Sequence, residues 1–342
     1  MSGAPSQPPR RRRRRLTLDE YEAGVRARDR VVLGRAITLI ESNAAADQQL
    51  AQELLGRLLP STGGAVRVGI TGVPGVGKST FIETFGKNLT GAGHRVAVLA
   101  VDPTSSRTSG SILGDKTRMT RLSSDPSAFI RPSPSSGSLG GVARKTRETM
   151  LICEAAGFDI ILVETVGVGQ SETVVADMVD FFLVLMLPNA GDELQGIKRG
   201  ILELADLIAV NKADTGGESA RLAKREYINA LRMMHGGAAD AGWQVPVLTI
   251  SGLNNSGLDV LWDAIGKYRA QAEASGALEN KRRDQLKRWM WSMVDEAVLR
   301  ALRQHPDVAR IAPGLEAEVL AGKKPPTLGA RRLLEAFGID AL

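Results

Sequence analysis

The chain has 342 residues, of which 43% are hydrophobic and 24% are charged, and these values exclude a chain that is disordered throughout. Lys and Arg number 44 against 38 Asp and Glu, which gives a net charge of +6. Six consecutive arginines, Arg10 to Arg15, carry that whole excess, so the remainder of the chain is formally neutral and a nucleic-acid partner is not expected. The arginine run is interpreted as a solvated tail without a specific partner, with contact to RNA or anionic lipid as the alternative.

The sequence contains no segment that is expected to cross a membrane or to direct secretion. Its longest strongly apolar run, Phe181 to Leu187, has the length of a strand, whereas a membrane helix needs about 18–20 apolar residues. The basic N-terminus is not followed by an apolar segment. Cys153 is the only cysteine, which excludes an internal disulfide and indicates a reducing compartment. We therefore expect a cytoplasmic protein that has no membrane partner.

The pattern of apolar residues divides the first 274 residues into three parts. Residues 1–15 are expected to form a disordered arginine-rich arm, and residues 16–62 an N-terminal helical segment. From residue 63 to 274, short Val- and Ile-rich runs alternate with stretches long enough for helices. The expected strands are Val66–Ile70, Val96–Val101, Ile160–Val163, Phe181–Leu187, Leu207–Val210 and Val245–Ile250. Buried strands that alternate with helices predict an α/β fold with a mostly parallel sheet.

Residues 275–342 lack strand signals and are expected to form a helical extension. Apolar residues recur at helical spacing, and they are Leu286, Met290, Met293, Ala297 and Ala301. Pro306 is expected to end this helix, and Pro325-Pro326 to interrupt the short helices of the tail. Such a stripe belongs either to the core of the chain or to an interface with another chain.

A glycine-rich motif follows the first expected strand and opens a helix. It reads G-x-x-x-x-G-K-S and comprises Gly72, Val73, Pro74, Gly75, Val76, Gly77, Lys78 and Ser79, with Thr80 directly after it. In this context the pattern is typical of a P-loop, because glycines let consecutive N–H groups point at phosphate oxygens. Lys78 is expected to neutralise the charge of the β- and γ-phosphates, and the Ser79 hydroxyl to ligate Mg²⁺. The sequence therefore predicts a P-loop NTPase fold.

A second motif, N-K-x-D, indicates that the base of the nucleotide is guanine. Asn211, Lys212 and Asp214 follow the Leu207–Val210 strand. An aspartate carboxylate can accept hydrogen bonds from N1–H and the exocyclic amine of guanine, which adenine does not present. Ser251-Gly252-Leu253 follows the next strand and can offer backbone N–H groups to the guanine O6. We therefore expect GTP rather than ATP as the ligand.

Acidic residues at other strand ends are candidates for Mg²⁺ and for catalysis. Glu164 ends an apolar strand and Gly167 follows three residues later, an arrangement that fits contacts with Mg²⁺ and the γ-phosphate, respectively. Asp102 follows another strand, and Asp115 lies in the loop beyond it. A carboxylate at either position would bind Mg²⁺, directly or through water, or orient the attacking water. Ordinary turn and strand-end roles remain alternatives for each of them.

The chain has no glutamine directly after Gly167, where small GTPases position their water. Gln170 lies three residues further on and is a candidate for that role. Intrinsic hydrolysis is therefore expected to be slow and to depend on a partner. Lys198 and Arg199 are candidates for stabilising the transition-state charge, with ordinary solvated helix charges as the alternative.

Taken together, four segments resemble the MeaB/ArgK family of P-loop GTPases. They are 72–80, 102–106, the run E-T-V-G-V-G-Q-S-E at 164–172, and 211–214. The resemblance implies a homodimer in which the C-terminal extension, residues 275–342, reaches across to the other subunit. It also implies a GTPase chaperone of adenosylcobalamin-dependent methylmalonyl-CoA mutase, which couples GTP to cofactor loading and to protection of the mutase.

The same resemblance adds weight to particular residues. It implies an additional switch loop at about 188–198, with Lys198 as the residue through which the mutase stimulates hydrolysis. Ser79, Asp102, Asp115 and Glu164 would form the magnesium and switch set. Three alternatives remain open from the residues alone: a nickel-insertion metallochaperone GTPase, a P-loop kinase acting on a small molecule or protein, and a module that binds nucleotide without hydrolysing it.

Overall fold

The computed structural model describes residues 14–102, 119–132, 139–166, 171–188, 199–234 and 242–339. Of the predicted site residues, Asp115, Gly167, Gln170 and Lys198 lie outside these ranges. The chain divides into two compact units, 1–271 and 272–342, which are described separately.

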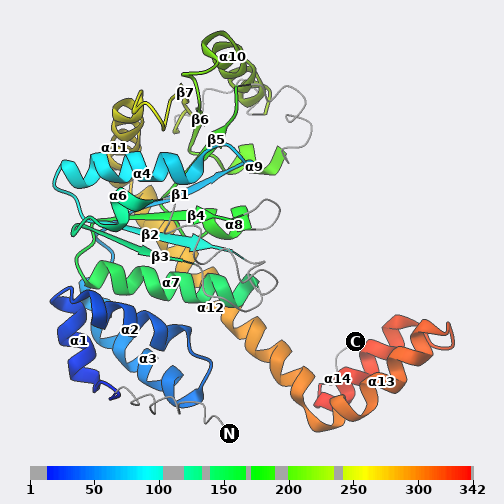
Figure 1. Ribbon diagram of the computed structural model, residues 1–342. Coiled ribbons are helices and arrows are strands. Elements are labelled where there is room, and N and C mark those ends of the chain that lie inside the picture. Colours follow the sequence, from blue (N-terminus) through cyan, green and yellow to red (C-terminus); the bar gives the residue numbers. More distant parts are fainter. Residues whose placement is uncertain are drawn as a thin grey trace, which may run out of the picture. The chain divides into compact units, whose positions relative to one another are not determined.

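The first unit is built on a seven-stranded parallel sheet (Figure 1). Its strands are β1 Val66–Gly72, β2 Val96–Val101, β3 Ala128–Arg131, β4 Ile160–Thr165, β5 Phe181–Met186, β6 Leu207–Val210 and β7 Val247–Thr249. They are ordered β3-β2-β4-β1-β5-β6-β7, and every neighbouring pair is parallel. The six runs expected from the sequence are confirmed as strands, and the α/β P-loop architecture with them. The short edge strand β3 was not predicted.

Helices cover both faces of the sheet because alternate strand residues point to opposite sides. On one face, Val96 and Val98 join a core with α4 Lys78–Gly91, α6 Thr120–Ser123 and α11 Leu258–Ala274. On the other face, Ala97 and Leu99 join a core that includes α7 Leu139–Ala155 and α10 Gly217–Met234. Two short helices, α8 Ser171–Ala176 and α9 Arg199–Leu204, complete the layer around the sheet.

Three helices precede the sheet, as the sequence predicts for residues 16–62. They are α1 Leu18–Arg26, α2 Arg30–Glu41 and α3 Ala45–Leu58, followed by a 3₁₀ turn at Leu59–Ser61. Thr17 and Glu20 form a capping box that starts α1, and the Asp29 carboxylate caps the first N–H groups of α2. Their apolar faces continue the core that contains α7. Figure 1 shows this helical layer against α7.

The second unit contains α12 Ala277–Gln304, α13 Pro306–Leu320 and α14 Pro326–Phe337. Pro306 and Pro326 each occupy the first turn of a helix, where the missing N–H costs no helical hydrogen bond. Large apolar side chains of α12 are exposed in the single chain, namely Leu286, Met290, Trp291, Val294, Val298 and Leu299. Among the described residues, no helix combines the length and the apolar character that a membrane crossing requires.

Candidate functional site

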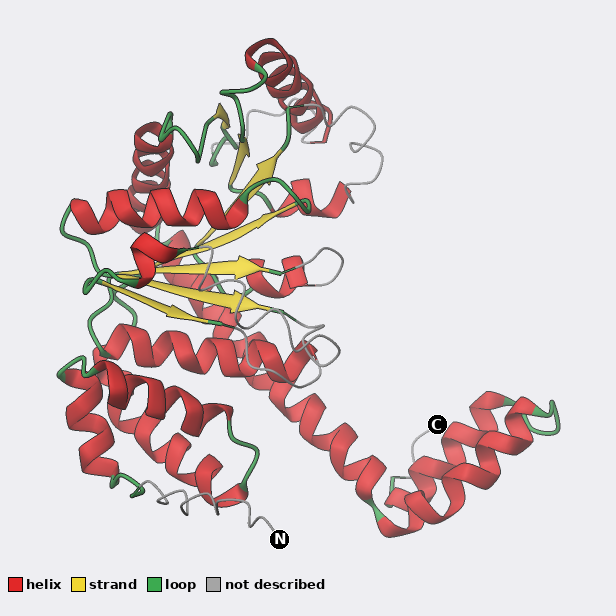
Figure 2. Cartoon of the chain, in the orientation of Figure 1, coloured by secondary structure: helices red, strands yellow, loops and turns green. Residues whose placement is uncertain are grey.

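All strands of the sheet end at the same edge because they are parallel, and the predicted motifs follow these ends (Figure 2). The glycine-rich loop follows β1, Asp102 follows β2, Glu164 lies near the end of β4, and Asn211 follows β6. In open α/β sheets, ligands bind outside the carboxyl ends of the strands. The topology therefore brings the predicted residues to one edge.

The loop between β1 and α4 has the backbone of a phosphate cradle. Gly77 adopts a left-handed conformation, with φ 92° and ψ 32°, directly before α4 begins at Lys78. Gly72 has φ 155°, and a Cβ there would lie 2.5 Å from the carbonyl oxygen of Leu185. Only glycine fits both positions without strain. The N–H groups of the first turn of α4 thus face the loop, which suits an anion.

The Lys78 side chain turns back across this loop. Its Nζ donates a hydrogen bond of 2.7 Å to the carbonyl oxygen of Gly72. Partial burial lowers the pKa of the Lys78 ammonium, while the negative charges of Glu164 and Glu172 act to raise it. Glu172, which is 2% exposed, was not singled out as a site residue, although it lies within the E-T-V-G-V-G-Q-S-E run. The ammonium of Lys78 thus bonds to the cradle backbone and is influenced by the charges of two buried carboxylates.

Asp102 and Glu164 are buried on neighbouring strands. Ala100 of β2 lies opposite Glu164 of β4, and the N–H of Val166 donates to the carbonyl oxygen of Val101 at 2.9 Å. Asp102 is 3% and Glu164 is 4% exposed. Two buried carboxylates therefore lie at neighbouring strand ends, and the strand of Glu164 adjoins β1.

These oxygens and the Ser79 hydroxyl match the ligand chemistry of Mg²⁺. No group of three His, Cys, Asp or Glu side chains poised for a metal occurs in the described part of the chain. Mg²⁺ does not need one, since it usually takes one or two carboxylates and completes its shell with phosphate and water. The donor set fits a Mg²⁺–nucleotide complex rather than an all-protein metal cage.

A buried hydroxyl pair joins the cradle strand to the strand of Glu164. Thr71 Oγ1 and Thr165 Oγ1 are 2.8 Å apart, and the residues are 1% and 0% exposed. The pair precedes Gly72 on one strand and follows Glu164 on the other. No sequence pattern predicted this contact, because a threonine near a strand end is common.

Asn211 connects the cradle with the loop that follows β7. Its Nδ2 donates to the Val76 carbonyl oxygen at 2.8 Å, and its Oδ1 accepts from the Gly252 N–H at 2.9 Å. Asn211 is 3% exposed, whereas Lys212 and Asp214 are exposed. The Asp214 carboxylate is thus accessible to a ligand, and Asn211 is committed to the protein.

The loop from Ser251 to Gly257 is closely ordered. The N–H of Ser251 donates to Ser256, that of Gly252 to Asn211, and that of Asn254 to the Ser251 hydroxyl. The N–H of Leu253 makes no hydrogen bond with any residue that the structure describes. Of the three N–H groups expected to face guanine O6, that of Leu253 is therefore available without rearrangement.

The structure thus brings the cradle, Asn211 and Gly252 into direct contact, and it places Lys78 within the electrostatic influence of Glu164. Thr80 and Ser79 lie in the first turn of α4.

Comparisons with known proteins agree with this arrangement. Residues 33–307 match the family described as methylmalonyl-CoA mutase-associated GTPase MeaB. A putative GTPase of Caulobacter vibrioides is 58% identical over 95% of this chain and 99% of its own length. The mouse protein named methylmalonic aciduria type A homolog, mitochondrial, is 47% identical over 94% of this chain and 79% of its own. A crystal structure of an LAO/AO transport system kinase superposes with a TM-score of 0.76 at 38% identity, covering 94% of this chain and 98% of that one.

Proposed function

This chain belongs to the MeaB family of methylmalonyl-CoA mutase-associated GTPases, and we propose on that premise that it is a Mg²⁺-dependent GTPase chaperone of such a mutase. The observation that supports the GTPase part is the position of the Asn211 side chain. It forms hydrogen bonds both with the cradle and with the loop from Ser251 to Gly257, which is called the base loop below. One nucleotide then binds with its phosphates at the cradle and its base at this loop.

In this proposal each end of the nucleotide has its own residues. The loop Gly72–Gly77 and the first turn of α4 surround the phosphates, and Lys78 offsets their charge. The Asp214 carboxylate accepts from N1–H and the exocyclic amine of guanine, and the Leu253 N–H donates to O6. Ser79, Asp102 and Glu164 would hold Mg²⁺, and the bound ion would neutralise charge on the phosphates.

In the hydrolysis step, water attacks the γ-phosphorus in line with the bridging oxygen to the β-phosphate, the bond to that oxygen breaks, and GDP leaves together with inorganic phosphate. Asp102, Asp115 and Gln170 are the candidates for orienting this water, and Gly167 for contacting the γ-phosphate. We further propose slow intrinsic turnover, because the chain lacks a glutamine directly after Gly167.

The mutase partnership rests on the family and on the names of relatives. In the proposal, segments 164–172 and 188–198 bind the mutase differently in the GTP and GDP states, so hydrolysis shifts the population between two complexes. The outcome for the mutase is loading and protection of adenosylcobalamin. The single buried cysteine agrees with a cytoplasmic, reducing setting.

We also propose a homodimer formed through residues 275–342. The exposed apolar side chains of α12 support it, because a surface row of this kind is costly to leave in water. Size-exclusion chromatography with light scattering tests it: Met290→Glu with Val294→Glu should yield monomers. A wild-type protein that is monomeric at micromolar concentration would contradict the dimer. The division of the chain into segments 1–15, 16–62, 63–274 and 275–342 remains a prediction.

The decisive experiment measures phosphate and GDP release with and without a purified adenosylcobalamin-dependent methylmalonyl-CoA mutase. We expect equal amounts of GDP and inorganic phosphate, faster release with the mutase, and a nucleotide-dependent complex on a sizing column. Lys198→Ala should keep basal turnover and lose the stimulation. A GDP excess over phosphate would instead favour the kinase activity that the name of the similar crystal structure suggests.

A further inference from the structure

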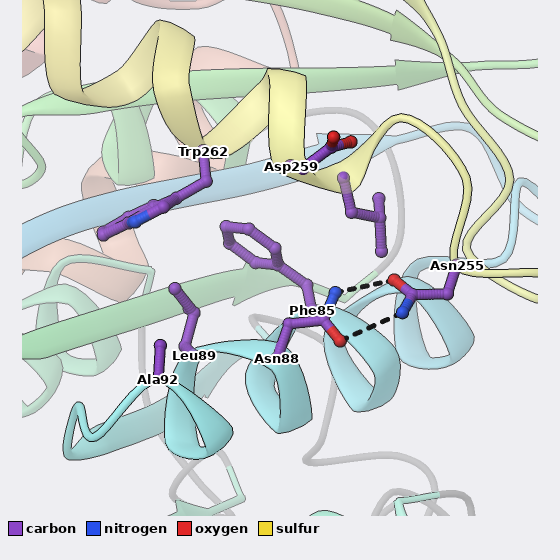
Figure 3. Close-up of a pocket in the computed structure, with 8 residues that line it drawn as sticks. Phe85, Asn88, Leu89, Ala92, Asn255, Asp259 and Trp262 are labelled. Atoms are coloured by element: carbon purple, nitrogen blue, oxygen red, sulfur yellow. Dashed lines mark hydrogen bonds between the residues drawn. The ribbon is translucent and has the colours of Figure 1, made fainter.

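Two asparagine side chains join α4 to the loop that follows β7 (Figure 3). Asn88 Nδ2 donates to Asn255 Oδ1 at 2.6 Å, and Asn255 Nδ2 donates to Asn88 Oδ1 at 3.2 Å. The residues are 167 positions apart in the chain. Because each amide both donates and accepts, the pair fixes the orientation as well as the distance of the two segments.

Beside this asparagine pair, the helices α4 and α11 are not tightly packed against each other. An open groove with a volume of about 340 Å³ lies between α4 and α11, with Phe85, Leu89 and Trp262 among its lining residues. The rings of Phe85 and Trp262 meet edge to face at 6.0 Å. Figure 3 shows the asparagine pair at the border of this groove. The amide pair therefore adds a polar contact between α4 and the loop at a place where apolar packing is incomplete.

Asn255 is firmly connected to the proposed base-binding residues. Ser251 and Ser256 exchange backbone hydrogen bonds of 3.0 and 3.1 Å, which close the loop around Asn255. Asn255 has φ 54°, a left-handed conformation that asparagine tolerates better than most residues. A displacement of Asn255 would therefore be transmitted to Leu253 within the same closed loop.

The other side of the same loop is fixed against α4 and Asn211. A Cβ on Gly252 would lie 2.9 Å from the Cα of Phe81, so the loop rests directly on the start of α4. The Gly252 N–H is held by Asn211. Because α4 begins at Lys78, directly after the phosphate cradle, the same helix borders the cradle and contacts the base loop.

We propose that Asn88 and Asn255 are positioning residues for guanine recognition, which hold the Leu253 N–H at the distance from the cradle that one guanine nucleotide spans. This inference rests on the proposed GTPase function, because it gives that loop its ligand. It assigns a role in nucleotide specificity to a helix position three turns beyond the P-loop, outside every recognised motif.

The test compares the binding of GTP and ATP to full-length variants by titration calorimetry. Asn88→Ala removes both bonds without disturbing the helix, and Asn255→Gly removes them while preserving the left-handed backbone. Each should weaken GTP and GDP binding about three- to tenfold, the value of an exposed neutral hydrogen-bonded pair. ATP binding and kcat at saturating GTP should not change, so the preference for GTP falls by the same factor.

Three further variants sharpen the test. The double variant Asn88→Ala with Asn255→Gly should match the single variants, because both remove one contact. Asn255→Asp retains an acceptor for Asn88 Nδ2 and should lie between wild type and Asn255→Gly. Asn254→Ala is the matched control, since this exposed neighbour makes no side-chain hydrogen bond with any residue in the described ranges. It should behave as wild type.

The outcomes are distinguishable. A wild-type protein without preference for GTP over ATP would overturn the guanine assignment, and with it the positioning role of Asn88 and Asn255. A preference for GTP that stays at the wild-type value in Asn88→Ala would overturn the positioning role alone. Equal losses of GTP and ATP affinity, together with a lower melting temperature, would show that the pair is a structural contact and would also overturn the inference.

Discussion

Replacement of Asn211 by alanine perturbs a contact that joins the two halves of the proposed nucleotide site. The side chain is 3% exposed and satisfies two backbone groups, the Val76 carbonyl and the Gly252 N–H. Alanine leaves both without this partner, and a buried group that loses its hydrogen bond costs about 1–3 kcal/mol. Because the adjoining Pro74 and Gly75 are exposed, water can reach part of the site, so we expect a total of about 2–4 kcal/mol.

Two measurements divide this cost between folding and binding. For a unit of this size, about 2–4 °C of melting temperature corresponds to 1 kcal/mol, so the nucleotide-free variant should melt roughly 5–15 °C lower. GDP binding should weaken by about tenfold or more, since the cradle and the base loop are no longer linked. Asn254→Ala is again the control and should change neither value. An Asn211→Ala protein that melts within 1 °C of wild type and binds GDP within about twofold would refute this reasoning.

Other expectations follow from single side chains. Lys78→Ala should weaken nucleotide binding about 10- to 100-fold, the range for a charged hydrogen bond, and calorimetry that finds binding and hydrolysis intact would mean that the P-loop is misassigned. Asp214→Asn should lower the ratio of GTP to ATP affinity, because the acceptor for N1–H is lost; an unchanged ratio in competition assays speaks against guanine recognition. The hydrogen bond from Lys87 holds the pKa of Asp125 below its usual 3.8. The ionised carboxylate therefore stabilises the folded state above pH 3.8, and this stabilisation is lost as the pH falls through the lower pKa of the folded state. Urea unfolding should therefore show Asp125→Asn to be about 1–3 kcal/mol less stable at pH 7, with a smaller difference near pH 3. Burial raises the pKa of the Cys153 thiol, which should react with a thiol reagent only after unfolding.

The sequence predicted six of the strands because each is a run of apolar residues buried on both faces. β3 escaped prediction because it has four residues, Ala128 to Arg131, and pairs with a single neighbour at the edge of the sheet. Pro306 was expected to end a helix, and it does separate α12 from α13, but it also begins α13. A proline signal alone does not say on which side of it the next helix starts.

For the site, local motifs singled out Lys78 and Asn211. The hydrogen-bond partner of Lys78, Gly72, lies six residues away within the same motif, whereas the partners of Asn211, Val76 and Gly252, lie 135 and 41 residues away and were not predicted. No sequence motif indicates a side-chain contact between distant segments, and the Thr71–Thr165 and Asn88–Asn255 pairs are of this kind. The sequence also could not tell that the N–H groups of Ser251 and Gly252 are already bonded within the protein.

The strand order has a consequence for how the chain can be made. The neighbours of β1 are β4 and β5, and Val66 pairs with Ile160. During synthesis the cradle strand therefore leaves the ribosome long before either neighbour exists, and its edges stay unpaired in the meantime. A nascent chain stopped before Ile160 cannot close the middle of the sheet. Arrested chains released just before and just after β5 should differ sharply in solubility and protease resistance.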